Sequence, residues 1–110
     1  MRDALPSGTA IEVARPDHDT DLGLVIAPDI FGLRPLYDEM VARLAEEWGT
    51  VTIAVEPFPD KDLGPDLEPR FAVVSDKTDV RSLGDLVAAA DRTECETVGL
   101  LGFCMKSPAT

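Results

Sequence analysis

The chain has 110 residues and 45% of them are apolar, which suits one small packed domain and argues against disorder throughout. It carries 21 Asp and Glu against 10 Lys and Arg, a net charge of −11, so binding to nucleic acid or to anionic membranes is disfavoured. No apolar run reaches the length of a membrane span, and no signal-peptide stretch opens the chain, so we expect a cytoplasmic protein.

The two cysteines, Cys95 and Cys104, are too few for a disulfide framework and do not form a metal-ligand spacing. Both thiols fit a reducing compartment. No G-x-G-x-x-G sequence follows a predicted strand, so a nucleotide site has little support. We therefore expect neither a metal nor a cofactor.

The first predicted strand covers residues 9–14, where Ile11 and Val13 alternate with polar neighbours as in a half-exposed antiparallel strand. The next strand, Leu22–Ala27, is continuously apolar. Such a run is typical of a strand that helices cover on both faces.

A helix is predicted to begin at Pro35, whose missing N–H costs nothing in a first turn. It ends at Gly49, where a left-handed residue is favoured. Its predicted apolar stripe consists of Leu36, Met40, Leu44 and Trp48, with Val41 and Ala45 beside them.

The remaining elements repeat this alternation. Val51–Val55 is predicted as the second buried strand and residues 97–103 as the third, with a loop at 57–69 and a helix at 78–92 between them. The predicted apolar face of that helix consists of Val80, Leu83, Leu86, Val87 and Ala90. The pattern predicts an α/β fold with a mostly parallel sheet flanked by helices.

Cys104 stands where the third buried strand runs into a turn with the sequence G-F-C-M. A nucleophile at a sharp strand-to-helix turn needs small neighbours because its backbone is strained, and the turn lifts its side chain above the sheet. The loop at residues 27–33, which contains Asp29, follows the first buried strand. Both segments are expected at the carboxyl edge of the sheet, where ligands of such folds bind.

Four segments, in order, read V-I-A-P-D-I-F-G-L-R-P, A-V-E-P-F, G-D-L-V-A-A-A and L-G-F-C-M. Together they resemble the dienelactone hydrolases, and the resemblance covers residues 22–105. It implies the N-terminal part of an α/β-hydrolase fold and a Cys-His-Asp triad. It also implies hydrolysis of enol-lactones such as dienelactone, or of related esters, and hence a small-molecule substrate.

By position, the resemblance makes Cys104 the nucleophile and the backbone N–H groups of Ile30 and Met105 the oxyanion hole. Asp29 matches a glutamate that contacts the cysteine in the resting enzymes of the family, and it is shorter by one methylene. Arg34 and Arg70 lie in loops where an arginine could hold a substrate carboxylate, and neither is assigned that role.

The chain departs from the family after the nucleophile. The family continues as C-x-G-G, whereas Lys106 replaces the first of these glycines and would crowd the strained turn. The triad Asp and His, which follow the nucleophile in this fold, are absent from the short remaining tail. His18, the one histidine, lies in a polar stretch before the first buried strand and is not expected to be the base. We therefore predict that residues 1–110 are a single partial domain that lacks its C-terminal half and is inactive alone.

Plainer interpretations stay open. Cys104 could be an ordinary buried cysteine, and Asp29 could shape a turn beside Pro28. The chain could also be a non-catalytic α/β fragment that self-associates through an exposed sheet edge. A flavodoxin-like binding module would show the same alternation of strands and helices.

Overall fold

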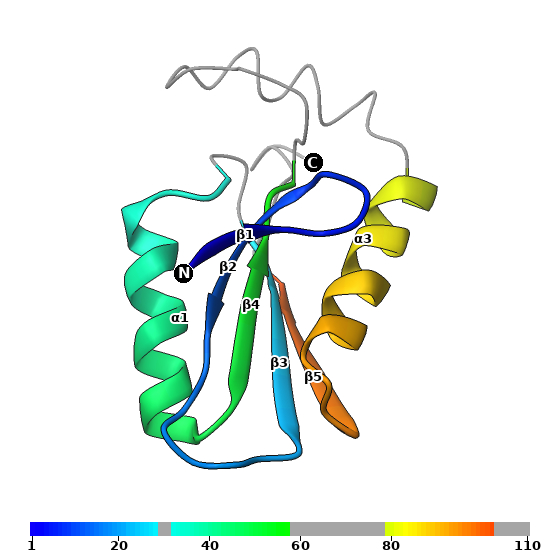
Figure 1. Ribbon diagram of the computed structural model, residues 1–110. Helices are drawn as coiled ribbons and strands as arrows, with labels where there is room; N and C mark the ends of the chain where they lie inside the picture. Colours follow the sequence, from blue (N-terminus) through cyan, green and yellow to red (C-terminus); the bar gives the residue numbers. More distant parts are fainter. Residues whose placement is uncertain (29–31, 58–78, 103–110) are drawn as a thin grey trace.

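The computed structural model describes residues 1–28, 32–57 and 79–102, with the backbone alone for residues 79–82. A five-stranded sheet lies between two helices (Figure 1). The elements, in chain order, are β1 (Arg2–Ala4), β2 (Ala10–Ala14), β3 (Leu22–Ala27), α1 (Pro35–Trp48), β4 (Val51–Val55), α3 (Asp79–Arg92) and β5 (Thr97–Gly102).

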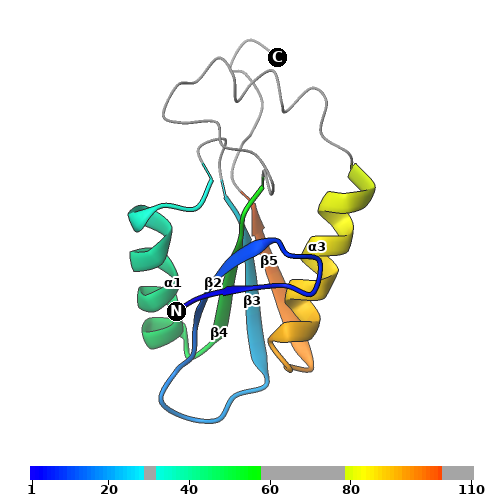
Figure 2. The same ribbon diagram turned by 45° about the horizontal axis from the view of Figure 1, so that its top comes forward.

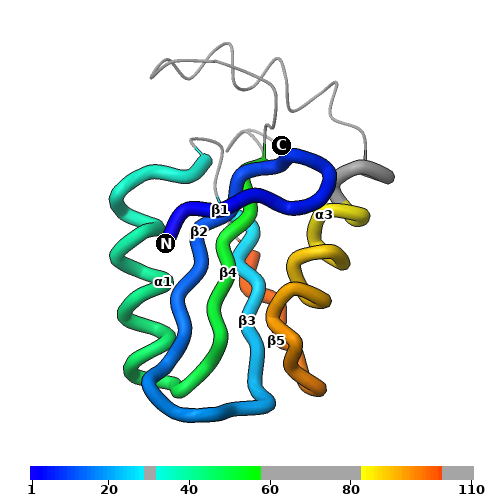
Figure 3. Tube along the Cα trace, in the orientation of Figure 1, coloured from blue at the N-terminus to red at the C-terminus, as the bar shows by residue number. Residues whose placement is uncertain are grey.

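The strands are ordered β1-β2-β4-β3-β5 in the sheet. The three strands predicted as buried, β3, β4 and β5, run parallel to one another, as expected from the repeated crossovers. The strand β2 pairs with β4 in the antiparallel direction, and β1 adds an antiparallel edge strand that the sequence patterns did not predict. The sheet is therefore mixed, and the trace in Figure 3 shows the N-terminal hairpin turning back beside β4.

The edge strand β1 explains why Glu12 on β2 is 8% exposed, although the alternating pattern assigned it to the wet face. Arg2 and Glu12 are register partners, so their side chains meet on one face of the sheet. The ammonium group of Met1 lies 2.6 Å from Oε2 of Glu12, and Nε of Arg2 lies 3.4 Å from Oε1. Two cations therefore compensate for the burial of this carboxylate.

Helix α1 spans Pro35–Trp48 with Gly49 as its C-cap, so Pro35 and Gly49 mark its ends as predicted. Gly49 has a φ of 65°, and its N–H donates to the carbonyl oxygen of Ala45 at 3.1 Å. Of the predicted apolar face, Val41 and Ala45 are buried, whereas Leu36 and Trp48 are 50% and 58% exposed. The residues that α1 buries are Tyr37, Val41 and Ala45.

Helix α3 confirms the predicted helix and part of its predicted face, since Leu86 and Ala90 pack against the core. Leu83 and Val87 are 62% and 61% exposed, whereas Asp85 and Ala89 are buried. The reason is a polar contact, because the carboxylate of Asp85 accepts hydrogen bonds from the hydroxyls of Ser7 (2.8 Å) and Thr9 (2.7 Å) in the β1–β2 hairpin. These bonds turn the Asp85 side of the helix inward.

Strand β5 was predicted to be buried, and the structure corrects this, because Leu100 is 64% exposed. Within the described residues β5 pairs with β3 alone, so it forms one edge of the sheet. Helix α1 packs against β2 and β4, and α3 packs against β3 and β4, which leaves β5 at the margin of both layers.

The apolar core has two halves, one on each face of the sheet, and Figure 2 shows the two helices on opposite sides. The half under α3 contains Leu5, Ile11, Val13, Val25, Ile53, Val55 and Ala89. The half under α1 contains Leu24, Ile26, Tyr37, Val41 and Ala54. Neither α1 nor α3, nor any other helix in the described ranges, combines the length and hydropathy needed to cross a bilayer.

Candidate functional site at the carboxyl edge of the parallel strands

The carboxyl ends of β3, β4 and β5 meet at one edge of the sheet. Ala27, the last residue of β3, is the register partner of Gly102, the last residue of β5. On the other side of β3, Ile26 is the partner of Ala54 in β4. Loops that follow these three strands therefore start side by side, the arrangement in which α/β folds build their ligand sites.

The residues predicted to carry the chemistry, Asp29, Ile30, Cys104 and Met105, lie outside the described residues, as do Arg70 and Lys106. The structure does describe the residues that lead into the segments of Asp29 and Cys104. Pro28, which precedes Asp29, is fully buried, and Gly102 lies two residues before Cys104. Because neighbouring strands are about 4.8 Å apart, the two segments leave the sheet from adjacent points.

A turn at Gly32 and Leu33 closes the loop that follows β3. Gly32 has a φ of 72°, a left-handed conformation that favours glycine. The carboxylate of Glu56, the residue after β4, lies against this turn, and Oε1 accepts a hydrogen bond from the Leu33 N–H at 3.4 Å. A Cβ at position 32 would stand 2.7 Å from both carboxylate oxygens of Glu56, so a side chain there would displace them.

Arg34, which the sequence left without a role, holds the other side of the same turn. Its Nη1 donates a hydrogen bond to the carbonyl oxygen of Gly32 at 3.1 Å. Its guanidinium carbon lies 5.2 Å from the centre of the Tyr37 ring, within cation–π range. Arg34 therefore connects the turn to the first turn of α1.

Glu56 is the residue of this edge that sequence reasoning missed. It stands within the segment A-V-E-P-F that carried the family resemblance, but no role was predicted for it. A signal was present, since a charged residue directly after a fully buried parallel strand reaches the edge where ligands bind. Its contact with the turn at Gly32 and Leu33 becomes apparent only from the structure.

The expected steric reason for Gly102 is not found among the described residues. A Cβ built on Gly102 meets no described atom within 4 Å. The crowding expected from the nucleophile turn concerns Cys104 and the residues that follow it, which lie outside the described ranges.

His18 lies at the opposite edge of the sheet, in the loop between β2 and β3. Its ring packs against Gly49, and its Nδ1 lies 3.4 Å from Oδ1 of Asp17. The length of β3 separates it from the carboxyl edge, roughly 17 Å of strand. The structure therefore places His18 at the amino edge of the parallel strands.

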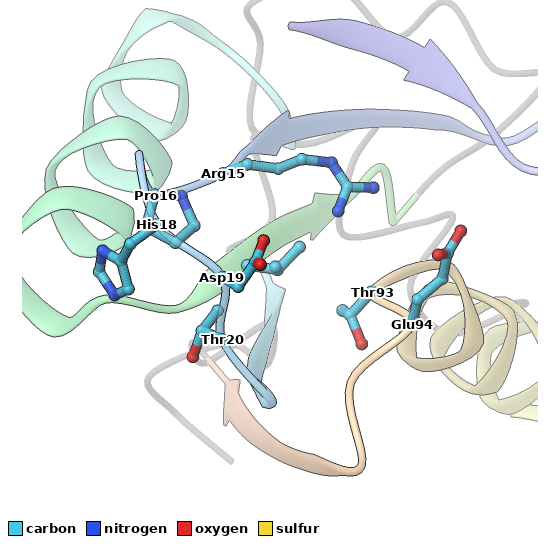
Figure 4. A pocket seen from close by; sticks show the side chains of 8 residues that line it. Arg15, Pro16, His18, Asp19, Thr20, Thr93 and Glu94 are labelled. Carbon is cyan, nitrogen blue, oxygen red and sulfur yellow. The ribbon is translucent and has the colours of Figure 1, made fainter.

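An open hollow of about 240 Å³ lies at this opposite edge. Figure 4 shows the Arg15 side chain extending toward Thr93 and Glu94, while the ring of His18 points away from them. The residues that line it are Arg15, Pro16, His18, Asp19, Thr20, Val51, Thr93 and Glu94. None of these described lining residues is a cysteine, and none lies in a loop that follows a parallel strand.

Among the described residues, a shifted pKa is found at Asp3, away from the carboxyl edge. The pKa of Asp3 in β1 lies below its ordinary value, because the Ala4 N–H and then the Arg92 guanidinium stabilise the carboxylate. No group of three or more His, Cys, Asp and Glu side chains in the described ranges is arranged to hold a metal ion.

No protein-family model and no curated protein sequence matches the chain. Among solved structures, its fold is similar to that of a protein from Klebsiella pneumoniae subsp. pneumoniae MGH 78578, provisionally named a dienelactone hydrolase. The TM-score is 0.79 at 24% sequence identity, and the match covers 94% of this chain and 49% of the other. The chain therefore has a dienelactone hydrolase-like α/β fold and spans about half the length of that protein.

Proposed function

We propose that the chain carries the nucleophile half of an ester- or lactone-hydrolysing site, with Cys104 as the attacking thiolate. The observation that carries this proposal is the pairing of Ala27 with Gly102. It starts the segments of Ile30 and Cys104 from adjacent strand ends. The likeness of the fold to a dienelactone hydrolase supports the same assignment.

In the proposed reaction the sulfur of Cys104 attacks the carbonyl carbon of the ester, and a C–S bond forms. The N–H groups of Ile30 and Met105 stabilise the negative charge on the carbonyl oxygen. The tetrahedral intermediate then loses the alkoxide, which leaves an acyl thioester on Cys104. The chemistry requires a reduced cysteine and therefore suits a reducing compartment such as the cytoplasm.

Breakdown of the thioester by water requires a base, and the one histidine of these 110 residues is His18. Because His18 lies at the amino edge of the parallel strands, it does not serve a nucleophile at the carboxyl edge. We therefore propose that the chain accepts an acyl group from an activated ester but does not turn over alone.

Rapid mixing of the 110-residue protein with p-nitrophenyl acetate tests this proposal, since p-nitrophenolate leaves as an anion without a general acid. We expect a burst of about one equivalent and no steady release, because deacylation lacks its base. Intact-mass analysis should find one added acetyl group. Sustained hydrolysis above the Cys104→Ala background would contradict the predicted lack of turnover.

Cys95 provides the matched control because it is the other thiol of the chain. It is partly buried in the turn before β5, and its Sγ lies 3.4 Å from the carbonyl oxygen of Thr93. Cys95→Ala should keep the burst and Cys104→Ala should lose it. A burst that survives in Cys104→Ala would refute the assignment of the nucleophile.

A second role, self-association, is favoured by the exposed edge at β5. The six residues Thr97–Gly102 include no charged residue and no proline, the features that usually protect an edge strand from pairing. Asp85 and Arg92 face the β1–β2 hairpin, so Leu83 and Val87 lie on the opposite flank of α3, nearer β5. Leu83, Val87 and Leu100 are all exposed apolar side chains.

We propose a second copy of the chain as the occupant of this edge, with the two β5 strands antiparallel. In a register centred on Gly99, Leu100 of each copy lies opposite Val98 of the other, which forms apolar cross-strand pairs. The antiparallel direction also keeps the exposed acids before β5, Glu94 and Glu96, at opposite ends of the shared ladder. A parallel arrangement would bring like charges together.

Light scattering of the wild type and of Leu100→Lys tests the association. We expect dimers of the wild type, stronger association at high salt because each chain has a net charge of −11, and monomers of the variant. Leu36→Lys on α1, where the leucine is 50% exposed, is the matched control and should still dimerise. A wild type that stays monomeric at all salt concentrations would rule out the interface.

A further inference from the structure

The peptide unit between Gly32 and Leu33 is held from both sides by charged side chains. Its carbonyl oxygen accepts a hydrogen bond from Nη1 of Arg34 at 3.1 Å. Its N–H donates to Oε1 of Glu56 at 3.4 Å. A cation on the oxygen and an anion on the N–H together fix the orientation of the peptide plane.

Glu56 can act in this way because its own backbone is fixed. Its N–H donates to the carbonyl oxygen of Ala10 in β2 at 2.9 Å, which extends the sheet by one residue beyond β4. All five residues of β4 are buried, and Pro57 on the other side of Glu56 is buried too. The carboxylate is therefore mounted on a rigid element rather than on a loop.

Gly32 and Glu56 form a coupled pair. The left-handed φ of Gly32 turns the next N–H toward the carboxylate, as in the backbone nests that bind anions. The missing side chain lets both oxygens of Glu56 approach to the place where a Cβ would stand. The turn thus has the form of an anion-binding site whose anion is supplied by the chain itself.

We propose that Glu56 is a positioning residue that orders the turn at Gly32 and Leu33 and contributes no group to the reaction. The proposal rests on the proposed function in one respect: this turn begins two residues after Ile30, whose N–H is assigned to the oxyanion. Its effect on Cys104 would therefore be indirect, through the donor.

Amide hydrogen exchange of Leu33, measured by NMR, tests the contact without any reaction. We expect Glu56→Ala to increase the exchange rate of this amide about tenfold, because the acceptor is removed. Glu56→Gln should keep most of the protection, since its amide oxygen can accept the same bond. Glu47→Ala, which removes an exposed carboxylate of α1, is the matched control and should leave the rate unchanged.

Formate added to Glu56→Ala provides a second readout that a role in packing alone would not show. A small carboxylate should occupy the position vacated by the Glu56 carboxylate and return the Leu33 amide resonance toward its wild-type position. Should the alanine variant fail to fold, Glu56→Asp, which withdraws the carboxylate by one methylene, is expected to lose the same protection.

The acylation burst then separates this inference from the proposed function. Loss of Leu33 protection together with slower acylation of Cys104 in Glu56→Ala would uphold both. Loss of protection in a protein whose burst does not depend on Cys104 would uphold Glu56 as the residue that orders the turn and refute the nucleophile. Leu33 exchange equal to that of Glu47→Ala would overturn the inference whatever Cys104 does.

Discussion

The two helices that flank the sheet have the same length and similar sequence patterns, yet different contacts hold them against the sheet. Helix α1 packs Tyr37, Val41 and Ala45 on the sheet, and its polar contact with the hairpin is an exposed ion pair between Asp38 and Arg2. Helix α3 adds buried and partly buried polar contacts to the apolar packing of Ala89, since Asp85 binds two hydroxyls of the β1–β2 hairpin and Arg92 pairs with Asp3. An apolar stripe therefore indicates that a helix is amphipathic, but polar partners elsewhere in the chain decide which side turns inward.

Replacement of Tyr37 by alanine should have the largest effect. Tyr37 is 1% exposed and is the largest fully buried side chain among the described residues, so Tyr37→Ala should lower the free energy of unfolding by about 3–5 kcal/mol. Trp48→Ala, at the end of the same helix, should change it by less than about 0.5 kcal/mol because that indole is 58% exposed. Urea unfolding measures both, and similar losses would mean that α1 packs through its predicted stripe instead.

Replacement of Asp85 should have the next largest effect and measures the polar seating of α3. Asp85→Ala removes the acceptor of the buried Thr9 hydroxyl and should lower the free energy of unfolding by about 1.5–3 kcal/mol. Asp91→Ala, an exposed carboxylate on the same helix, should be nearly neutral. If both variants unfold at the same urea concentration, the contrast between the two helices disappears.

Two valines compare the helices with the same substitution. Val41→Ala on α1 removes two buried methyl groups and should cost about 1.5 kcal/mol, whereas Val87→Ala on α3, where the side chain is 61% exposed, should cost less than about 0.5 kcal/mol. Thermal unfolding of the two variants and the wild type gives the difference. An equal cost would place Val87 in a buried environment and would contradict the orientation of α3.

The smallest effect is a pH dependence at Asp3. Because its pKa is lowered in the folded protein, its contribution to stability is complete above the ordinary value of 3.8 and is lost as the pH falls through the folded value. Asp3→Asn should therefore be slightly less stable than the wild type at neutral pH, and the gap should close in strong acid. The effect is small because Asp3 and Arg92 are both partly exposed. A gap that widens in acid would contradict the sign.

The strands and helices that depend on local chemistry could be predicted from the sequence. Pro35 and Gly49 define α1, and the continuous apolar runs define β3 and β4. Strand β1 could not be predicted, because three residues with two charges carry no strand pattern until β2 lies beside them. The burial of Asp85 depends in the same way on hydroxyls far away in the chain.

For the candidate site, the sequence predicted the meeting of loops at the carboxyl edge, and the pairing of Ala27 with Gly102 agrees with it. The roles of Asp29, Ile30, Cys104 and Met105 stay predictions, since these residues lie outside the described ranges. For Glu56, the sequence signals a place at this edge, but its proposed role depends on the peptide orientation at Gly32, which a residue pattern does not encode.

The strand order β1-β2-β4-β3-β5 also determines how the protein forms during synthesis. The β1–β2 hairpin leaves the ribosome before β4, because Val55, the register partner of Ile11, follows it by 44 residues. At translation rates of about 5–20 residues per second, the edge of β2 that pairs with β4 stays unpaired for roughly 2–9 s. This edge is covered once β4 has been synthesised and pairs with β2.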